Sequence, residues 1–546
     1  MTAIVETALG NVEGVYEKGS FVFRGIPYAR APVGELRWRP PVPPEPWQET
    51  LAARDFGPIA PQLPPSPITA VPGDPTEWSE DCLTLNIWTP GLDLSRRPVL
   101  VWIHGGGFVS GSGASILYEG AALAARGDLV VVTFNYRLGT LGFLAHPRLR
   151  DDVSGLAANW GLLDQLAALR WVRENIVGFG GDPGNVTVFG ESAGAMSAGC
   201  LMASRESVGL FRRAILQSGP PLVVDMDVAA ATTEALVRHL GLDEVDPVAM
   251  RKIPVAEIIA AQGRIEEASG GALGLSYSPV LDGDLIRQAP VKELSAGIAA
   301  DIPLLIGTNR DEVKLFAVAE QSVKDMDDEA MVELMSLTIA RIRERLKACG
   351  TGDGPLQPGM AEGSATGLST GWQDLVPVVE SIATAYKTMR GARGEGTEPF
   401  DIWSAISTDW VFRMPSLRVA EVQAAHQPLT FSYLFTWEAP AFGGALGACH
   451  ALELPFVFGT LGSPFVGFFA GSGPEAEQLS EKMQDAWIAF ARCGDPSHDG
   501  VGVWPPYDLS RRSTMVLGPQ TVVVEAPFDD ERRFWELDES LPQLAR

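Results

Sequence analysis

The sequence is poor in cysteine, with 5 in 546 residues. No two cysteines form a C-x-x-C pair, which argues against a zinc ribbon and against a dithiol redox centre. Because their number is odd, they cannot all be paired in a disulfide framework. Residues 1–16 also lack the basic and apolar segments of a secretion signal. Together these absences predict a protein of the reducing cytoplasm.

Positive charge is also scarce, because 42 Lys and Arg stand against 68 Asp and Glu, for a formal net charge of −26. A nucleic-acid-binding face needs basic residues to displace counterions, so the charge argues against that class of partner. It also disfavours anionic lipid surfaces, and no apolar run approaches the roughly 18 residues of a membrane span. The predicted partners are therefore a small-molecule substrate and water, with no nucleic acid or membrane. The oligomeric state is left open.

Hydrophobic residues make up 46% of the chain, so a large core is available. Continuous apolar runs, typical of strands buried on both faces, alternate with segments of helical spacing such as 162–175. The runs are Val99–Ile103, Leu129–Phe134, Val186–Phe189, Ala214–Leu216, Pro303–Ile306 and Leu429–Phe435. This alternation predicts an α/β fold, with a mostly parallel central sheet and helices on both faces. Sites of such sheets lie at the carboxyl ends of the strands.

The pattern G-x-S-x-G occurs at Ser192 and again at Ser369. In α/β hydrolases this pattern places a nucleophilic serine on a sharp turn between a strand and a helix. Ser192 follows the run Val186–Phe189 and precedes a segment of small helix-forming residues, whereas Ser369 follows a polar, Gly-rich loop. Ser192 is therefore the candidate nucleophile, against the alternative of an ordinary tight turn, and Ser369 is interpreted as a chance match.

A triple glycine follows the run Val99–Ile103 directly, in the segment His104–Phe108. Bare backbone N–H groups at such a place, together with the N–H after the nucleophile, can bind the oxyanion of a tetrahedral intermediate. We assign Gly106, Gly107 and Ala193 as these donors. A phosphate-binding loop is the alternative, but the segment lacks the Lys-Ser/Thr ending of that motif. His104 is interpreted as a structural residue of the loop.

Several long segments resemble the signatures of the type-B carboxylesterase family, which includes bacterial para-nitrobenzyl esterases and cholinesterases. They are Phe23–Ala29, Glu80–Pro90, Asn135–Gly139, Phe179–Gly194 and Phe211–Gly219. The resemblance implies an α/β-hydrolase fold with long excursions that form the walls of the active site. It also implies serine-dependent hydrolysis of carboxylic esters with no cofactor and no metal. We expect a single domain over residues 1–546, in which 320–400 is either a cap or wall over the site or an exposed excursion.

The general base of the triad should be a loop histidine that follows a strand, since the order in this fold is Ser, acid, His. His450 lies in such a loop after Leu429–Phe435, and the segment around it is similar to the histidine segment of the family. His239, His426 and His498 are interpreted as a solvated helix residue, a helix end and a polar-loop residue. A buried core histidine is the alternative for His450.

The acid of the triad should follow the run Pro303–Ile306. Asp311 and Glu312 both qualify chemically, and the resemblance selects Glu312. Its role is to orient the imidazole and stabilise the imidazolium. Ser218 is a possible supporting residue near the acid, also by resemblance. Five residues are candidates for the substrate pocket, and a position in the hydrophobic core is an equal alternative for each: Phe108, Trp410, Phe412, Phe442 and Leu446.

Three further expectations concern two cysteines and one salt bridge. No cysteine precedes Cys82, and Ala60 stands where the family usually has its partner, so Cys82 is expected to be a reduced, buried thiol. Cys449 lies beside His450, but no elbow surrounds it, which argues against a thiol nucleophile. Arg37 and Glu80 are expected to form a structural salt bridge, as in relatives.

The expected function is hydrolysis of small to medium uncharged carboxylic esters through a Ser192–His450–Glu312 triad and an acyl-enzyme. A lipase and a carbamate or amide hydrolase use the same triad and remain alternatives. A non-catalytic adhesion relative is disfavoured, because such proteins lose the nucleophile that this chain keeps.

Overall fold

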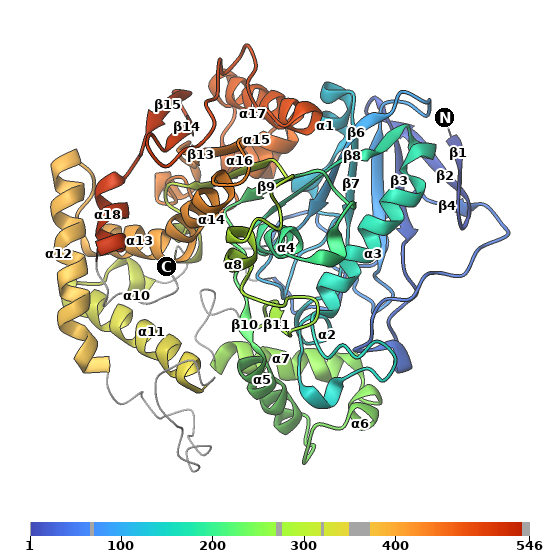
Figure 1. The fold of residues 1–546 in the computed structure, drawn as a ribbon, viewed down its shortest axis with the longest axis horizontal. Coiled ribbons are helices and arrows are strands. Elements are labelled where there is room, and N and C mark those ends of the chain that lie inside the picture. Colours follow the sequence, from blue (N-terminus) through green and yellow to red (C-terminus); the bar gives the residue numbers. More distant parts are fainter. Residues whose placement is uncertain (1, 66–69, 269–275, 318–320, 349–371, 538–546) are drawn as a thin grey trace.

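A central sheet of 13 strands runs through the molecule (Figure 1). The computed structural model describes residues 2–65, 70–268, 276–317, 321–348 and 372–537. The strands of the sheet are β1 Thr2–Thr7, β2 Gly10–Glu17, β3 Ser20–Pro27, β4 Leu51–Ala52, β5 Thr84–Thr89, β6 Arg97–Ile103, β7 Val130–Phe134, β8 Gly181–Glu191, β9 Arg213–Gln217, β12 Leu304–Asn309, β13 Thr430–Phe435, β14 Ser513–Leu517 and β15 Val522–Glu525. A separate pair joins β10 Val224–Asp225 and β11 Val280–Leu281.

The middle of the sheet is parallel, in the order β7-β6-β8-β9-β12-β13-β14. Antiparallel strands β1, β2, β3 and β5 continue it on one side, and β15 ends it on the other. In the parallel part, the carboxyl ends of β8, β9, β12 and β13 all meet the same edge. Side chains that follow these strands are therefore brought together.

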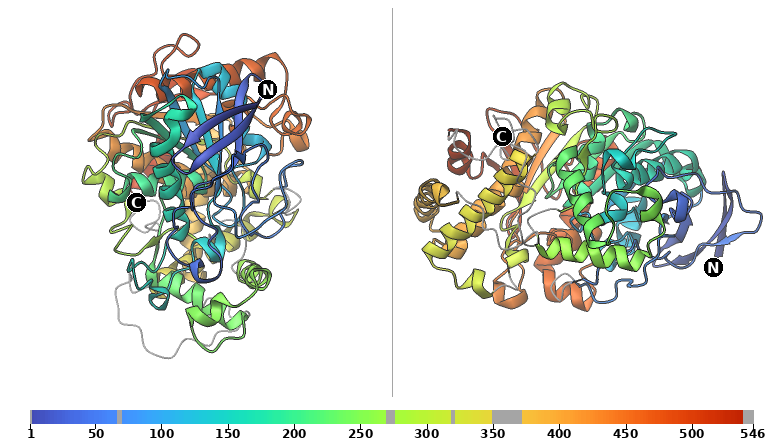
Figure 2. Two further views of the ribbon diagram at one scale, coloured as in Figure 1. Left: turned by 90° about the vertical axis from the view of Figure 1, so that its right-hand side faces the viewer. Right: turned by 90° about the horizontal axis from the view of Figure 1, so that it is seen from below.

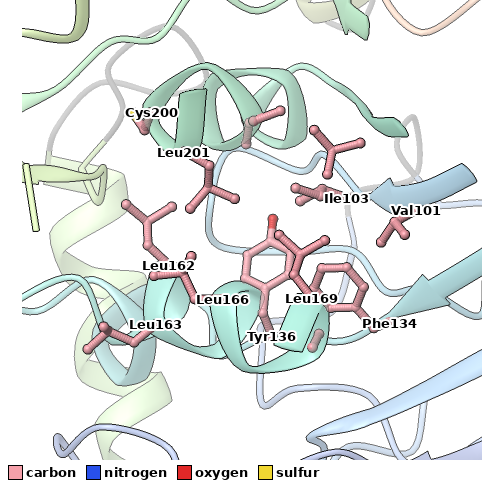
Figure 3. Close-up of a cluster of buried hydrophobic side chains, with 14 of the residues drawn as sticks. Val101, Ile103, Phe134, Tyr136, Leu162, Leu163, Leu166, Leu169, Cys200 and Leu201 are labelled. Atoms are coloured by element: carbon pink, nitrogen blue, oxygen red, sulfur yellow. The ribbon is translucent and has the colours of Figure 1, made fainter. Parts of the chain in front are cut away.

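Helices cover both faces of the parallel strands. Because side chains alternate from one face to the other along each strand, side chains that point in either direction are buried. On one face Val101 and Ile103 of β6 pack against helices α3 (Trp160–Asn175) and α4 (Ala193–Met202), as Figure 3 shows. On the other face Leu100 and Trp102 pack against α1 (Ala121–Gly127), α15 (Leu454–Phe458) and α17 (Pro474–Cys493). This two-faced burial explains the continuous apolar runs and confirms the predicted α/β class.

A further hydrophobic cluster lies outside the two sheet faces. It joins α11 (Asp328–Ala348), α12 (Val376–Arg393), α13 (Pro399–Thr408) and the π-helical turn η7 (Asp409–Arg413). Figures 1 and 2 show α11 and α12 at the end of the molecule opposite to the strands β1 and β2. The spacing in 372–389 predicts a helix here, and α12 indeed buries Val379, Ile382 and Ala383. Ser369 and the Gly-rich loop before it lie outside the described residues.

The other helices connect the strands or lie at the surface. They are α2 Gly139–Gly142, α5 Met226–His239, α6 Pro247–Arg251, α7 Val255–Ala268, α8 Pro290–Ser295, α9 Lys314–Ala317, α10 Gln321–Lys324, α14 Met414–Ala424, α16 Pro464–Ala470 and α18 Asp529–Leu537. No helix among the described residues has both the length and the apolar character needed to cross a bilayer.

Candidate active site

Ser192 lies at a sharp turn between strand β8 and helix α4. Its backbone has φ 54° and ψ −126°, a conformation that costs energy in any residue with a side chain. The turn is held from both sides: Ser192 N donates to Gln217 O (2.9 Å) at the end of β9, and Met196 N donates to Ser192 O (2.9 Å). This geometry exposes part of the Ser192 side chain at the carboxyl edge of the sheet.

Glycines around Ser192 allow its neighbours to approach closely. A Cβ on Gly194 would overlap the carbonyl oxygen of Ile103. A Cβ on Gly105 would lie 2.8 Å from Glu191 O and 3.1 Å from Ser192 Cβ. The loop after β6 is therefore packed directly against the Ser192 turn.

The three assigned oxyanion donors come from these two packed segments. Gly106 and Gly107 have φ of 107° and 60°. Within the described residues, the N–H groups of Gly106 and Gly107 donate to no backbone carbonyl. Ala193 is the first residue of α4, so its N–H has no partner inside the helix and lies at the positive end of the helix dipole.

His104 is buried beneath this loop, in agreement with its structural interpretation. Its ring stacks on Tyr136 with centroids 4.4 Å apart, and its Nδ1 lies 2.8 Å from Gly105 O. Burial lowers the pKa of His104 to about 4, so the ring is neutral at neutral pH and its Nδ1 donates to the carbonyl oxygen.

His450 and Glu312 meet at the carboxyl ends of β12 and β13. The Nδ1 of His450 lies 2.7 Å from Glu312 Oε2, and Glu312 Oε1 accepts a hydrogen bond from Asn309 N (2.7 Å). The histidine is 4% exposed and the glutamate 0%. Because a carboxylate only accepts hydrogen bonds, the contact places a proton on Nδ1, so Nε2 is the basic nitrogen in the neutral form of the imidazole.

Glu191, the residue before Ser192, faces the other nitrogen of the same ring. Its Oε1 lies 2.9 Å from His450 Nε2, so the two groups form an ion pair when the imidazole is protonated. The structure contains no hydrogen bond between Ser192 and His450 among the described residues. Sequence reasoning missed this role of Glu191, because the second position of G-x-S-x-G accepts many residues and carries no signal of its own.

The electrostatics of the histidine follow from its two carboxylate neighbours. Burial by itself would lower the pKa of His450, but Glu191 and Glu312 outweigh it and hold the pKa well above the usual range of imidazole. A third buried glutamate, Glu453, accepts from Gln217 Nε2 (3.0 Å) and Asn309 Nδ2 (2.7 Å). Burial, with Glu191 and Glu312 nearby, raises the pKa of Glu453 to about 8.

Two aromatic rings cover the histidine. The ring centroids of Phe412 and Phe316 lie 4.9 Å and 5.1 Å from that of His450. Among the candidate pocket residues, Phe412 thus lies beside the site, on turn η7. The structure gives the others different contacts: Phe108 contacts Phe143 in the core, Trp410 and Leu446 are buried in clusters, and Phe442 is 59% exposed beside Phe468.

Ser218 follows β9 next to strand β12. Its N–H donates to Gly307 O (2.8 Å), but its buried hydroxyl has no hydrogen-bond partner among the described residues. It therefore lies near the acid loop without contacting Glu312 through a hydrogen bond.

The predictions of a free, buried Cys82 and of a salt bridge between Arg37 and Glu80 are confirmed. Cys82 is free and buried, and burial raises the pKa of its thiol. Cys449 is likewise free and buried. Arg37 pairs with Glu80 through two contacts of 2.7 Å each, from Nε to Oε1 and from Nη2 to Oε2.

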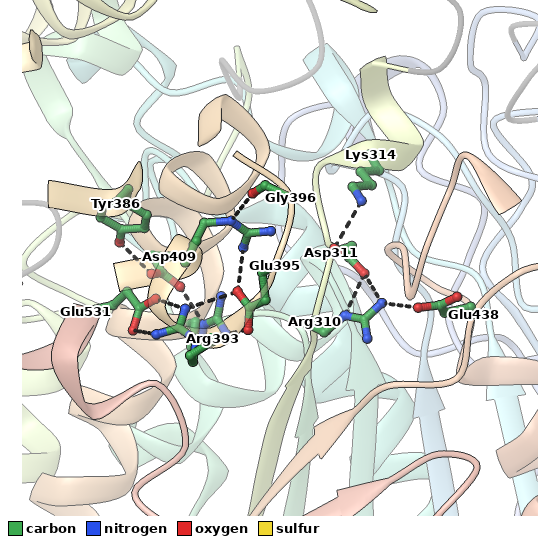
Figure 4. Close-up of polar contacts among 12 residues, drawn as sticks. Arg310, Asp311, Lys314, Tyr386, Arg393, Glu395, Gly396, Asp409, Glu438 and Glu531 are labelled. Atoms are coloured by element: carbon green, nitrogen blue, oxygen red, sulfur yellow. Dashed lines mark hydrogen bonds and ion pairs between the residues drawn. The ribbon is translucent and has the colours of Figure 1, made fainter. Parts of the chain in front are cut away.

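A charged cavity of about 270 Å³ lies beside the acid loop, but it is not lined by Ser192 or His450. Its walls carry both signs of charge, among them Arg310, Asp311 and Arg413. Figure 4 shows Arg310 paired with Asp311, and Arg413 forms an ion pair with Asp409. The cavity is therefore separate from the serine and histidine, and we do not assign the substrate to it.

Known proteins resemble this chain over its whole length. The carboxylesterase family profile matches residues 1–535. A para-nitrobenzyl esterase of Bacillus subtilis is 37% identical over 97% of this chain and 98% of its own length, and a phenmedipham hydrolase of Pseudarthrobacter oxydans is 37% identical over 95% of each. The crystal structure of a Geobacillus stearothermophilus carboxylesterase, 38% identical, superposes with a TM-score of 0.80 over 97% of this chain and 99% of that one.

The matches cover 98% of the length of the para-nitrobenzyl esterase and 99% of the crystallised carboxylesterase, and both relatives are named as esterases. They match the α/β-hydrolase architecture that positions the Ser192 turn at the sheet edge. The chain belongs to the carboxylesterase family and is a serine-dependent hydrolase of carboxylic esters.

Proposed function

We propose that Ser192, His450 and Glu312 form the catalytic triad of this esterase. The observation that carries the proposal is the 2.7 Å contact between His450 Nδ1 and Glu312, which leaves Nε2 basic beside the Ser192 turn. The N–H groups of Gly106, Gly107 and Ala193 form the oxyanion hole. Ser218 is proposed as a supporting residue, whose N–H joins the end of β9 to strand β12, which precedes the acid loop.

The proposed reaction proceeds by two acyl transfers. His450 Nε2 takes the proton of Ser192 Oγ as the oxygen attacks the ester carbonyl, and the oxyanion hole binds the negative oxygen. The imidazolium then protonates the leaving alcohol, and water repeats the sequence on the acyl-enzyme. The hydrogen bond from Ser192 to His450 is absent from the structure, and such bonds often form only once substrate is bound.

We propose small to medium uncharged esters as the substrates. Two aromatic rings beside His450 favour an apolar acyl or alcohol group. The carboxylates of Glu191 and Glu312, which flank His450 on both sides, disfavour an anionic group at the same place. A panel of nitrophenyl esters that vary in acyl length and in charge tests this, with phenmedipham and an emulsified triglyceride as further substrates. Preference for anionic or emulsified long-chain esters would contradict the proposal.

Replacing Gly106 with alanine should lower kcat by about 10²- to 10³-fold, the usual cost of losing an oxyanion donor. A Cβ there would overlap the Ser110 carbonyl oxygen, and the φ of 107° is itself unfavourable for alanine, so the loop must move. Steady-state kinetics on a short nitrophenyl ester measure the effect. Gly34→Ala is the matched control, because Gly34 also has a positive φ but nothing within 4 Å of its Cβ position. Equal activity of both variants would contradict the assignment.

Replacing Glu191 with glutamine should move the acidic limb of the pH profile of kcat/KM to lower pH. Glu191 raises the pKa of His450, so its neutralisation lets the neutral imidazole persist to lower pH. The matched control is Glu453→Gln. Because the pKa of Glu453 is raised to about 8, its carboxyl is already neutral at acidic pH and the substitution changes no charge there. An unmoved limb in Glu191→Gln, or an equal movement in both variants, would argue against this electrostatic role.

We further propose that residues 1–546 form one domain, in which α11 and α12 belong to the 320–400 excursion. Their shared cluster with turn η7, which carries Phe412, supports a wall beside the site. We propose the cytoplasm as the compartment, supported by the unpaired thiols of Cys82, Cys200 and Cys449.

A further inference from the structure

Asp311 lies between the acid of the proposed triad and the loop that carries His450. Its own N–H donates to Ala448 O (2.9 Å), and its Oδ2 accepts from Ala448 N (2.9 Å). One residue thus makes a two-way bridge between the loop after β12 and the loop after β13. We propose that Asp311 is a positioning residue, which fixes the distance between Glu312 and His450 by clamping their two loops together.

Further contacts between the two loops run alongside this bridge. His450 N donates to Glu312 O (3.2 Å), and Asn309 Nδ2 donates to Cys449 O (2.7 Å). Gly447 permits the close approach, since a Cβ there would lie 2.5 Å from Asp311 Oδ2. Two of these contacts come from side chains outside the triad, those of Asp311 and Asn309. Because Asn309 also hydrogen-bonds to Glu453, a substitution of Asp311 is the more selective way to remove a contact between the two loops.

The carboxylate of Asp311 is held in place by two cations. Arg310 Nε donates to Oδ2 (2.9 Å), and Lys314 Nζ lies 3.2 Å from Oδ1, as Figure 4 shows. Burial would raise the pKa of Asp311, but Lys314 and Arg310 outweigh it and lower the pKa below its usual value. The side chain is therefore ionised, mostly buried and directed at Ala448, which explains why it is not the triad acid despite its suitable chemistry.

The test compares three variants, with kcat normalised to active sites titrated by a fluorophosphonate. Asp311→Ala removes the acceptor for Ala448 N, and kcat should fall by about 10- to 100-fold with KM nearly unchanged, as expected when reacting groups are displaced by about 1 Å. Asp311→Asn keeps an oxygen that can accept from Ala448 N and should lose less. Glu438→Gln is the matched control, because it removes the other carboxylate that contacts Arg310 (2.6 Å). Glu438 is exposed, so the kcat of this variant should stay within about twofold of that of the parent protein.

Three outcomes would overturn the inference. In the first outcome, Asp311→Ala has the same kcat as Glu438→Gln. In the second, the fall in kcat of Asp311→Ala disappears after normalisation to active sites, which would make the role of Asp311 purely structural. Asp311→Asn could also fall as far as Asp311→Ala, which would show that charge rather than the bridge matters. The inference rests on the proposed triad, and Glu312→Gln separates the two: an active Glu312→Gln refutes the triad, whereas an inactive one beside an active Asp311→Ala refutes only the clamp.

Discussion

Replacing Ser192 with alanine should lower kcat for a chromogenic short-chain ester by about a millionfold, as removal of a triad nucleophile does in other serine hydrolases. The reason is that no acyl-enzyme can form without Oγ, so only the binding and polarisation of the carbonyl by the oxyanion donors remain. The turn itself should persist, because it is held by backbone contacts to Gln217 and Met196. The thermal unfolding midpoint should therefore stay close to that of the parent protein.

The control for this prediction comes from the sequence itself. Ser369 occupies the second G-x-S-x-G pattern, and Ser369→Ala should leave kcat unchanged. If Ser369→Ala were inactive and Ser192→Ala active, the assignment of the nucleophile would be wrong.

Replacing Glu312 with glutamine should lower kcat by about 10⁴-fold with little change in KM, the effect of neutralising the acid of a triad. The glutamine amide can donate to Nδ1, which favours the tautomer with its proton on Nε2 and so removes the base from the side of Ser192. Its carboxamide also gives no charge to stabilise the imidazolium. Measurement of kcat and KM at several pH values tests this.

Glu453→Gln serves as the matched control, because it alters a buried glutamate of the same cluster that hydrogen-bonds to Asn309 but does not touch His450. We expect the control to keep most of its activity at pH 7, where Glu453 is largely protonated. If the kcat of Glu312→Gln were within tenfold of that of the parent protein, Glu312 would not be the acid of the triad.

The parts of the fold that the sequence predicts well are those with a simple period. The run Val99–Ile103 corresponds to β6, and the helical spacing of 162–175 corresponds to α3. Strand β5 was missed because Thr84, Asn86 and Thr89 interrupt its apolar pattern. All six residues of β5 are nevertheless buried, since Asn86 binds Gly25 N and Thr133 Oγ1. Tertiary hydrogen bonds thus make polar residues acceptable where periodicity excludes them.

The residues of the site also fall into two groups, those that the sequence predicts and those that it does not. Ser192 and the glycines of its loop are recognisable from local motifs, because the turn itself demands those residues. Glu191 and Asp311 are not, because their importance arises from contacts with His450 and Ala448, far along the chain. Only the sheet topology brings those loops together, and a linear pattern does not encode a distance between them.

Covalent labelling is the most direct test of the central claim, that Ser192 is the nucleophile of an acyl-enzyme esterase. The intact protein would be treated with a fluorophosphonate, and the modified peptide would be mapped by mass spectrometry. The account predicts one adduct per chain on Ser192, suppressed by prior acylation with a slowly released ester and absent from Ser192→Ala. An adduct on another residue, or no adduct in a protein that hydrolyses esters, would contradict it.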